Sequence, residues 1–351
     1  MQKFKIVFCF ILLSISLVES KKKFIKKHIK ISKCQKFIYS FLKKNKYKYS
    51  QTLCNETKKN ITNIIIEDRI FNICKRELVQ WYKKKTKKKI NIENPKTFNE
   101  KIQWLKLYDY TPLKTQLTDK YLVKEWVKSK IGEKYVIKLL GSWDSFDQIN
   151  FDLLPNQFVI KTNHGAGYNI IVKDKSKLNI KNARKKINKW MKTDYCFKSG
   201  FEFQYLNIKR KIIAEEYLEN NKNELYDYKV FCFDGKVDTI AFFSERKKRV
   251  KLAFYDLNWN KLNYTFYGYD KKIMPKPKNL DELIKLSEIL SQGFAHVRVD
   301  FYILNDGSIK FGEMTFYTHS GTAHWRPAKV DKIYGKKLKL PSKKKLSFFN
   351  Y

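Results

Sequence analysis

Apolar side chains near the end of the first third of the chain recur at the three- and four-residue spacing of a helix, which predicts two helical segments. The first begins after Thr97, whose side chain can form a capping box with Glu100. It ends before Thr111 and Pro112, because a proline cannot continue a helix. The second predicted helix covers residues 117–130.

Short apolar runs replace the helical spacing from about residue 155 onward, and they predict strands separated by turns. The predicted strands are 158–160, 170–172, 212–218 and 228–233, and the predicted helices are 181–191 and 280–290. Strands and helices mix without a regular strand–helix–strand alternation. The pattern therefore favours an α+β fold with antiparallel hairpins over a doubly wound parallel sheet.

A long stretch over residues 296–315 predicts a β-hairpin. Asp306 and Gly307 lie between its two apolar-rich arms and favour a two-residue type I′ turn. That turn places Asp300 directly opposite Glu313 on one face of the sheet, because side chains alternate along a strand. The other face then holds side chains that can pack on a core, namely Val299, Phe301, Ile303 and Met314.

The two facing carboxylates need a positive partner, because like charges directly opposite each other destabilise a sheet. A hard divalent cation that also carries phosphates would remove the repulsion. The alternative is that both acids point into water and are neutralised by Arg298, which the same turn places opposite Thr315. The hairpin therefore predicts either a metal site or a solvated charge cluster.

A small, glycine-rich segment joins the first two predicted strands. Gly165, Ala166 and Gly167 would let backbone N–H groups approach phosphate oxygens closely, and Lys161 would add a positive charge at the end of the preceding strand. The segment lacks the Gly-Lys-Ser/Thr of a Walker loop and the third glycine of a dinucleotide fingerprint. An ordinary hairpin turn is the alternative interpretation.

The composition of the chain limits its class. Its 351 residues include 74 Lys and Arg against 34 Asp and Glu, a net charge of +40, and residues 1–90 carry 25 of these cations against 5 acids. Twelve Gly and seven Pro exclude a collagen-like or a Pro/Gly-rich disordered chain. The charge suits nucleic acid, acidic lipid or anionic polysaccharide. A sequence-wide bias toward lysine would also produce it, and this is the interpretation we favour for the charge alone.

The N-terminus has the pattern of a signal peptide. Lys3 and Lys5 precede an apolar run over residues 6–18, and small residues occupy positions −3 and −1 of a cleavage site after Ser20. Cleavage after Ser20 would send the chain into the secretory pathway, to the lumen of the ER or Golgi or outside the cell. An uncleaved membrane anchor held by the lysines at 21–23 is the alternative, although the run is short for a membrane span.

Several stretches, taken in order, resemble the ATP-grasp superfamily and most closely its TupA-like branch. They are residues 94–101, 140–144, 154–165, 227–236, 297–302 and 312–316. The resemblance covers residues 91–341 as one ATP-grasp domain. Before it lie the predicted signal peptide or anchor (1–20) and a basic helical stem (21–90), and after it a basic tail (342–351).

The resemblance implies two α+β subdomains that clasp ATP, and an ATP- and Mg²⁺-dependent ligase or related transferase acting on an acidic glycan or its peptide decoration. ATP-grasp enzymes phosphorylate a carboxylate, which an amine then usually attacks. The alternative is a non-catalytic ATP-grasp shell whose basic stem docks on an anionic polymer or a membrane. No specific nucleic acid partner is predicted.

The resemblance also implies a role for each matching residue. The phosphate contacts would be Lys161, His164, Gly165, Ala166, Gly167 and Lys173. The adenine pocket would be lined by Glu215, Glu216, Tyr217 and Leu218, and Asp227 would contact the ribose. Lys229 or Arg298 would make a catalytic contact with the γ-phosphate, and the Mg²⁺ ligands would be Asp300, Glu313 and Thr315.

Overall fold

The computed structural model describes residues 56–219, 225–244 and 251–345. Residues 90–344 form one compact unit, and the other unit contains α4 (Glu56–Thr86), a helix within the predicted stem. The predicted signal peptide, the rest of the stem up to residue 55 and residues 346–351 of the predicted tail lie outside the described residues. Among the helices that are described, none is both long and apolar enough to cross a bilayer.

The capping box predicted at the first helix of the larger unit is confirmed. It starts α5 (Phe98–Tyr108). The Thr97 hydroxyl accepts a hydrogen bond from the Glu100 backbone N–H at 3.3 Å, and the Glu100 carboxylate accepts one from the Thr97 N–H at 3.0 Å. These reciprocal bonds satisfy two backbone donors that a helix start otherwise leaves unpaired.

The single helix predicted over 117–130 is wrong, because two helices occupy this part of the chain. They are α6 (Pro112–Thr118) and α7 (Val123–Ile131). Asp119 separates them, since its carboxylate accepts hydrogen bonds from the backbone N–H groups of residues 121 and 122. Such local side-chain acceptors compete with the helical ladder and end it.

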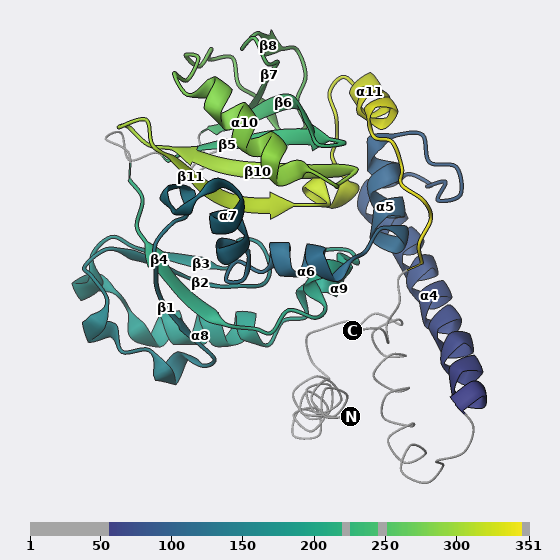
Figure 1. Cartoon of the computed structure of the whole chain (residues 1–351), viewed down its shortest axis with the longest axis horizontal. Coiled ribbons are helices and arrows are strands. Elements are labelled where there is room, and N and C mark those ends of the chain that lie inside the picture. The colour runs from purple at the N-terminus through teal and green to yellow at the C-terminus, as the bar shows by residue number, and fades with distance from the viewer. Residues whose placement is uncertain (1–55, 220–224, 245–250, 346–351) are drawn as a thin grey trace. The chain divides into compact units, whose positions relative to one another are not determined.

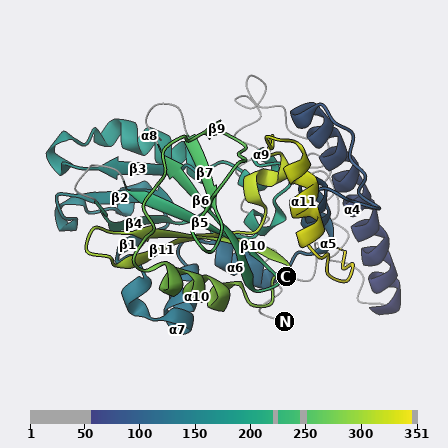
Figure 2. The same cartoon turned by 90° about the horizontal axis from the view of Figure 1, so that it is seen from above.

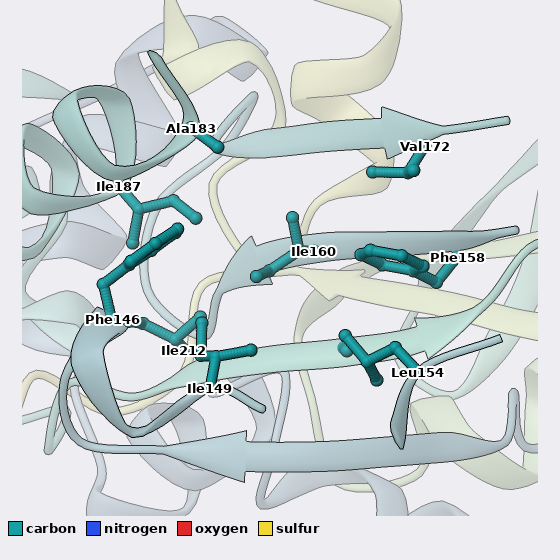
Figure 3. Close-up of a cluster of buried hydrophobic side chains, with 10 residues drawn as sticks. Phe146, Ile149, Leu154, Phe158, Ile160, Val172, Ala183, Ile187 and Ile212 are labelled. Carbon is teal, nitrogen blue, oxygen red and sulfur yellow. The ribbon is translucent and has the colours of Figure 1, made fainter. Parts of the chain in front are cut away.

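A four-stranded antiparallel sheet forms the first lobe of this unit. Its elements are β1 (Leu139–Trp143), β2 (Phe158–Thr162), β3 (Asn169–Val172), α8 (Ile180–Met191), α9 (Tyr195–Lys198) and β4 (Ile212–Glu216). The strand order is β1-β4-β2-β3. One face packs against α8 through Phe158 and Ile160, which meet Ala183 and Ile187 in a buried core (Figure 3). The opposite face, which carries Lys161 and Glu215, does not take part in this core.

A seven-stranded sheet forms the second lobe. Its strands are β5 (Tyr226–Phe233), β6 (Lys236–Ser244), β7 (Lys251–Tyr255), β8 (Lys261–Leu262), β9 (Gly268–Tyr269), β10 (His296–Ile303) and β11 (Ile309–Thr315). The main path runs β11-β10-β5-β6-β7-β8, and β9 pairs with β7. All these pairings are antiparallel except β7 with β9, so the predicted α+β fold with antiparallel hairpins is confirmed.

One face of the seven-stranded sheet is covered by α10 (Leu280–Ser291), which packs on β5, β6 and β10 and beside α7 (Figure 2). Leu283, Leu286 and Leu290 of α10 are buried there. Figure 1 shows the four-stranded sheet beneath this lobe, with α8 on its far side. A last helix, α11 (Lys329–Lys337), packs against α5.

The hairpin of β10 and β11 has a different turn from the predicted one. The carbonyl of Leu304 accepts from the Gly307 N–H at 3.0 Å, and the Leu304 N–H donates to Ser308 at 2.9 Å. The loop therefore has three residues, with Gly307 in the left-handed region at φ +83°. A three-residue loop shifts the pairing by one, so that Ile303 faces Ile309.

A β-bulge then restores the predicted pairing at the polar end of the hairpin. The register shifts between Asp300 and Phe301, and Gly312 is the additional residue on β11. A Cβ at Gly312 would lie 3.0 Å from the Asp300 carbonyl oxygen, so the bulge favours glycine. Beyond the bulge Asp300 faces Glu313, as predicted.

Candidate functional site

Six polar side chains gather on the face of the seven-stranded sheet that α10 leaves uncovered. Three adjacent strands supply them in pairs: Asp227 and Lys229 from β5, Arg298 and Asp300 from β10, and Glu313 and Thr315 from β11. Asp300 occupies the centre, because it faces Lys229 on one side and Glu313 on the other. All the metal and catalytic candidates of the hairpin therefore meet in one cluster.

Asp300 is held by two cations. It is 2% exposed, its Oδ1 accepts from Arg298 Nε at 2.6 Å, and its Oδ2 accepts from Arg298 Nη2 at 2.7 Å. Lys229 Nζ also contacts Oδ2. The alternative in which both acids point into water is therefore wrong for Asp300, although its prediction of a neutralising Arg298 is confirmed.

Glu313 is the more open of the two carboxylates, with its side chain 35% exposed. Its Oε1 accepts from Arg298 Nη2 at 3.3 Å and from the Thr315 hydroxyl at 3.1 Å, whereas Oε2 lies 3.9 Å from Lys120 Nζ. Burial raises the pKa of Glu313, but Lys120, Lys229 and Arg298 outweigh it and lower the pKa to about 2. Glu313 is therefore ionised at neutral pH.

The donor set fits Mg²⁺, which prefers hard oxygen ligands and is commonly held by one or two carboxylates together with phosphate oxygens and water. Glu313 Oε2 is accessible to a cation, and the Thr315 hydroxyl lies beside it. Asp300 would have to exchange a contact with Lys229 or Arg298 in order to ligate. The cluster could thus hold an ion shared with a phosphate ligand.

Lys161 lies at the end of β2 beside the glycine-rich loop, on the polar face of the four-stranded sheet. Its Nζ contacts one oxygen of Glu215 in β4, and Lys124 of α7 binds the other at 2.7 Å. Burial raises the pKa of Glu215, but these two lysines outweigh it and the pKa is lowered. The Glu215 side chain therefore positions Lys161. This role differs from the place in an adenine pocket that was predicted for Glu215.

The glycine-rich loop, residues 163–167, contains two glycines with left-handed backbone. Gly165 has φ +85° and Gly167 has φ +71°. A Cβ at Gly165 would lie 2.7 Å from the Tyr195 ring, whereas a Cβ at Gly167 would meet nothing within 4 Å. The backbone near Gly167 is thus open to a ligand, while Gly165 is packed against the lobe.

His164 does not fit the phosphate contact predicted for it. The side chain is buried, and its Nε2 donates to the carbonyl of Trp190 at 3.1 Å. Burial, aided by Arg210, lowers the pKa of His164 to about 4, so the ring is neutral and its one N–H is already used. His164 instead fixes the loop to the end of α8.

Lys120, which sequence reasoning missed, joins the two lobes. Its backbone N–H donates to the carbonyl of Asn163 at 3.0 Å, and its Nζ donates to the carbonyl of Gly165 at 2.7 Å. The same Nζ lies 3.9 Å from Glu313 Oε2. The only sequence signal was Asp119, a helix-breaking side chain just before it, which anchors Asn163 at 2.9 Å.

A family model described as a TupA-like ATP-grasp matches residues 100–339, which is more than half of the chain. The chain belongs to the TupA-like ATP-grasp family. The matched residues lie within the range 91–341 over which the sequence motifs showed the resemblance. No curated protein sequence matches the chain significantly.

Solved structures similar to this TupA-like ATP-grasp chain are distant. D-alanine–D-alanine ligase from Bacillus anthracis is 17% identical, with a TM-score of 0.34 and 57% of each chain covered. N5-carboxyaminoimidazole synthetase from Staphylococcus aureus, complexed with ADP, is 13% identical, with a TM-score of 0.38 and coverage of 64% of this chain and 53% of that one. ATP-grasp ligase PsnB, complexed with minimal precursor, Mg and ADP, is 12% identical, with a TM-score of 0.33 and coverage of 63% of this chain and 55% of that one. The chain thus spans little more than half of each.

The remaining nucleotide candidates lie at separate places in the ATP-grasp domain. Lys173 follows β3 at the end opposite the glycine-rich loop and pairs with Glu219 at 3.2 Å, so it is not brought to the loop as predicted. Residues 216–218 end β4 and continue beyond it, and Glu216 is exposed. Asp227 is buried in the cluster on β5, 2.9 Å from Lys229.

Proposed function

We propose that this chain is an ATP- and Mg²⁺-dependent ligase. The observation that carries the proposal is the position of Lys120, whose Nζ contacts the glycine-rich loop at Gly165 and approaches Glu313 in the carboxylate cluster. A loop open to phosphates and a pair of oxygen ligands for a divalent ion therefore lie within reach of one side chain. That is the arrangement a magnesium nucleotide requires.

An apolar surface for the nucleotide base lies on the same face as Lys161. Val159 precedes Lys161 by two residues in β2 and pairs with Ile171 of β3, so all three side chains share this face. Ile171 is 59% exposed, although apolar side chains on the opposite face of the sheet are buried. An exposed apolar side chain beside phosphate-binding groups supports a purine nucleotide as the ligand.

The chain's own residues would divide the chemistry as follows. Lys161 and Lys120 would bind phosphate oxygens, and the backbone at Gly167 would approach them closely. Arg298 and Lys229 would place positive charge against the transferring phosphoryl group in a buried setting, where such charges act most strongly. Mg²⁺, when held by Asp300 and Glu313, would supply further positive charge at the same oxygens.

The acceptor that we propose is an acidic glycan or its peptide decoration. The net charge of +40 supports an anionic acceptor, because it would raise the local concentration of a negatively charged substrate. The four positive side chains Lys120, Lys161, Lys229 and Arg298 at the site add to this field.

We expect nucleotide to stabilise the purified full chain in a magnesium-dependent manner. A ligand that binds only the folded state at 100 times its Kd adds about 2.7 kcal/mol to the free energy of unfolding. Thermal unfolding with ATP or ADP, with Mg²⁺ and with EDTA, measures this. If neither nucleotide changes the melting temperature while polyanions do, the chain is a non-catalytic binder and the ligase proposal fails.

We further propose that the chain enters the secretory pathway through residues 1–20, which requires an ATP supply in that compartment. The basic start, the apolar run over residues 6–18 and the small residue Ser20 support this. Mass spectrometry of the mature protein should find its N-terminus at or near Lys21. Recovery of the chain from the cytosol with Met1 intact would contradict the proposal.

A further inference from the structure

The exposed side of α8 carries positive charge only. It presents Lys181, Arg184, Lys185, Lys186 and Lys189 to solvent, and the helix contains no acidic residue. Among the described residues, only Arg184 of these five has an ion-pair partner, which is Asp147 in the short 3₁₀ helix Phe146–Gln148. The helix therefore presents a continuous basic surface on the outer side of the first lobe.

The lysine bias of the whole sequence does not account for this surface. Each of the other described helices of eight or more residues contains at least one acid, including Glu100 in α5, Glu125 in α7 and Asp331 in α11. In α10, Asp281 precedes Lys285 by four residues, a spacing that stabilises a helix. The absence of acids is thus particular to α8 among them.

The charge pattern of α8 is also unfavourable for the helix itself. Lys181, Lys185 and Lys189 follow each other at intervals of four residues, which places like charges on adjacent turns. Like charges at this spacing destabilise a helix. The helix is held instead by its apolar side, where Ala183 and Ile187 are buried in the core of the four-stranded sheet (Figure 3). An external anion would relieve the repulsion.

We propose that the exposed face of α8 is a docking surface for a linear anionic polysaccharide. The three lysines are spaced about 6 Å apart along the helix axis, so a polymer with regularly repeated carboxylates or sulfates can contact each in turn. The C-terminal end of α8 fixes the glycine-rich loop through the bond of His164 to Trp190. A chain bound along α8 therefore extends toward the nucleotide site, although docking itself does not depend on the proposed reaction.

A polysaccharide fits this face better than a membrane does. A helix that lies on a bilayer inserts an exposed apolar face below the headgroups. The apolar side of α8 is already occupied, since Ala183 and Ile187 are fully packed and Trp190 and Met191 lie against the same core. The one large apolar side chain of α8 classed as exposed is Ile180, at 39%. The face offers charge without an apolar anchor.

Heparin serves as the probe in the decisive experiment, which uses the full chain without nucleotide at about 0.15 M salt. One variant combines Lys181→Gln, Lys185→Gln and Lys189→Gln. The matched control combines Lys329→Gln, Lys332→Gln and Lys336→Gln in α11, which are also exposed and change the net charge equally. We expect the α8 variant to bind heparin about tenfold more weakly with a shallower salt dependence, and the control to lose less than about twofold.

Three results would overturn the proposal. Equal losses in both variants would show that net charge, and not α8, attracts the polymer. Failure of the wild-type chain to bind heparin at this salt concentration would remove the surface altogether. Binding of the wild type to vesicles containing phosphatidylserine, lost in the α8 variant while heparin binding persists, would assign the face to a membrane. The nucleotide-dependent melting shift, measured in parallel, reports separately on the ligase proposal.

Discussion

Glu313→Gln should abolish the effect of Mg²⁺ on nucleotide binding and lower ATP turnover by about 100-fold or more. The substitution keeps the shape of the side chain but removes the anionic oxygen that lies open beside Lys120. Because the Glu313 side chain is 35% exposed, we expect the free protein to lose only about 1–2 kcal/mol of stability. Calorimetric titration of ADP with and without Mg²⁺ measures the first effect directly.

Asp300→Asn should behave differently, although the two carboxylates face each other. Asp300 is buried and contacts both Arg298 and Lys229, so its neutralisation removes one carboxylate partner from each of these buried cations. Among the described carboxylates, Lys229 then keeps Asp227, and Arg298 keeps the longer contact with Glu313. Breaking such a buried ion pair costs about 3–5 kcal/mol. Repulsion between the carboxylates alone would have predicted a free protein that is no less stable, and the contacts of Asp300 reverse that expectation.

A control for both variants lies on the opposite face of the same sheet. Glu288→Gln in α10 makes the same chemical change at a side chain that binds Lys236. It should leave the magnesium effect intact. If Glu313→Gln retains a wild-type response to Mg²⁺, the carboxylate pair is not a metal site, and if it unfolds the protein as strongly as Asp300→Asn, the pair is structural.

The facing of Asp300 and Glu313 could be predicted from the sequence only because two errors cancel. Asp306 and Gly307 indicated a two-residue turn, whereas the loop has three residues and shifts the pairing by one. The bulge at Gly312 shifts it back. A turn is encoded by a few adjacent residues, but a bulge depends on how both strands pack, so local patterns predict the first more readily than the second.

The partners of the predicted residues could not be predicted, because they come from distant parts of the chain. Lys120 approaches Glu313, which lies 193 positions later in the sequence. Lys124 binds Glu215, which lies 91 positions later. In the sequence both lysines lay inside one expected helix, with no feature that separated them from the many other lysines. Helix and strand periodicity predicts which face a residue occupies, but not which element covers that face.

Lys161→Ala should weaken ATP binding by about 1.5–3 kcal/mol, which is about 10- to 150-fold in Kd, because a charge-assisted phosphate contact is lost. Glu215 holds Lys161 in place beside the glycine-rich loop. The matched control is Lys173→Ala, since Lys173 lies at the other end of β3 and pairs with Glu219. We expect its ATP affinity to stay within about twofold of the wild type.

Gly167→Ala tests the loop without removing any charge. The added Cβ would meet no protein atom within 4 Å, so the substitution acts through the left-handed backbone at φ +71° and through the space that a phosphate would occupy. At Gly165 the Tyr195 ring lies 2.7 Å from the added Cβ, which would confuse lost packing with lost binding. Gly167→Ala should therefore weaken ATP binding, and it should also cost the free protein about 1–2 kcal/mol of stability, because alanine is strained in the left-handed region. Unchanged affinity in both Lys161→Ala and Gly167→Ala would mean that the loop is an ordinary hairpin turn and that the phosphates bind elsewhere.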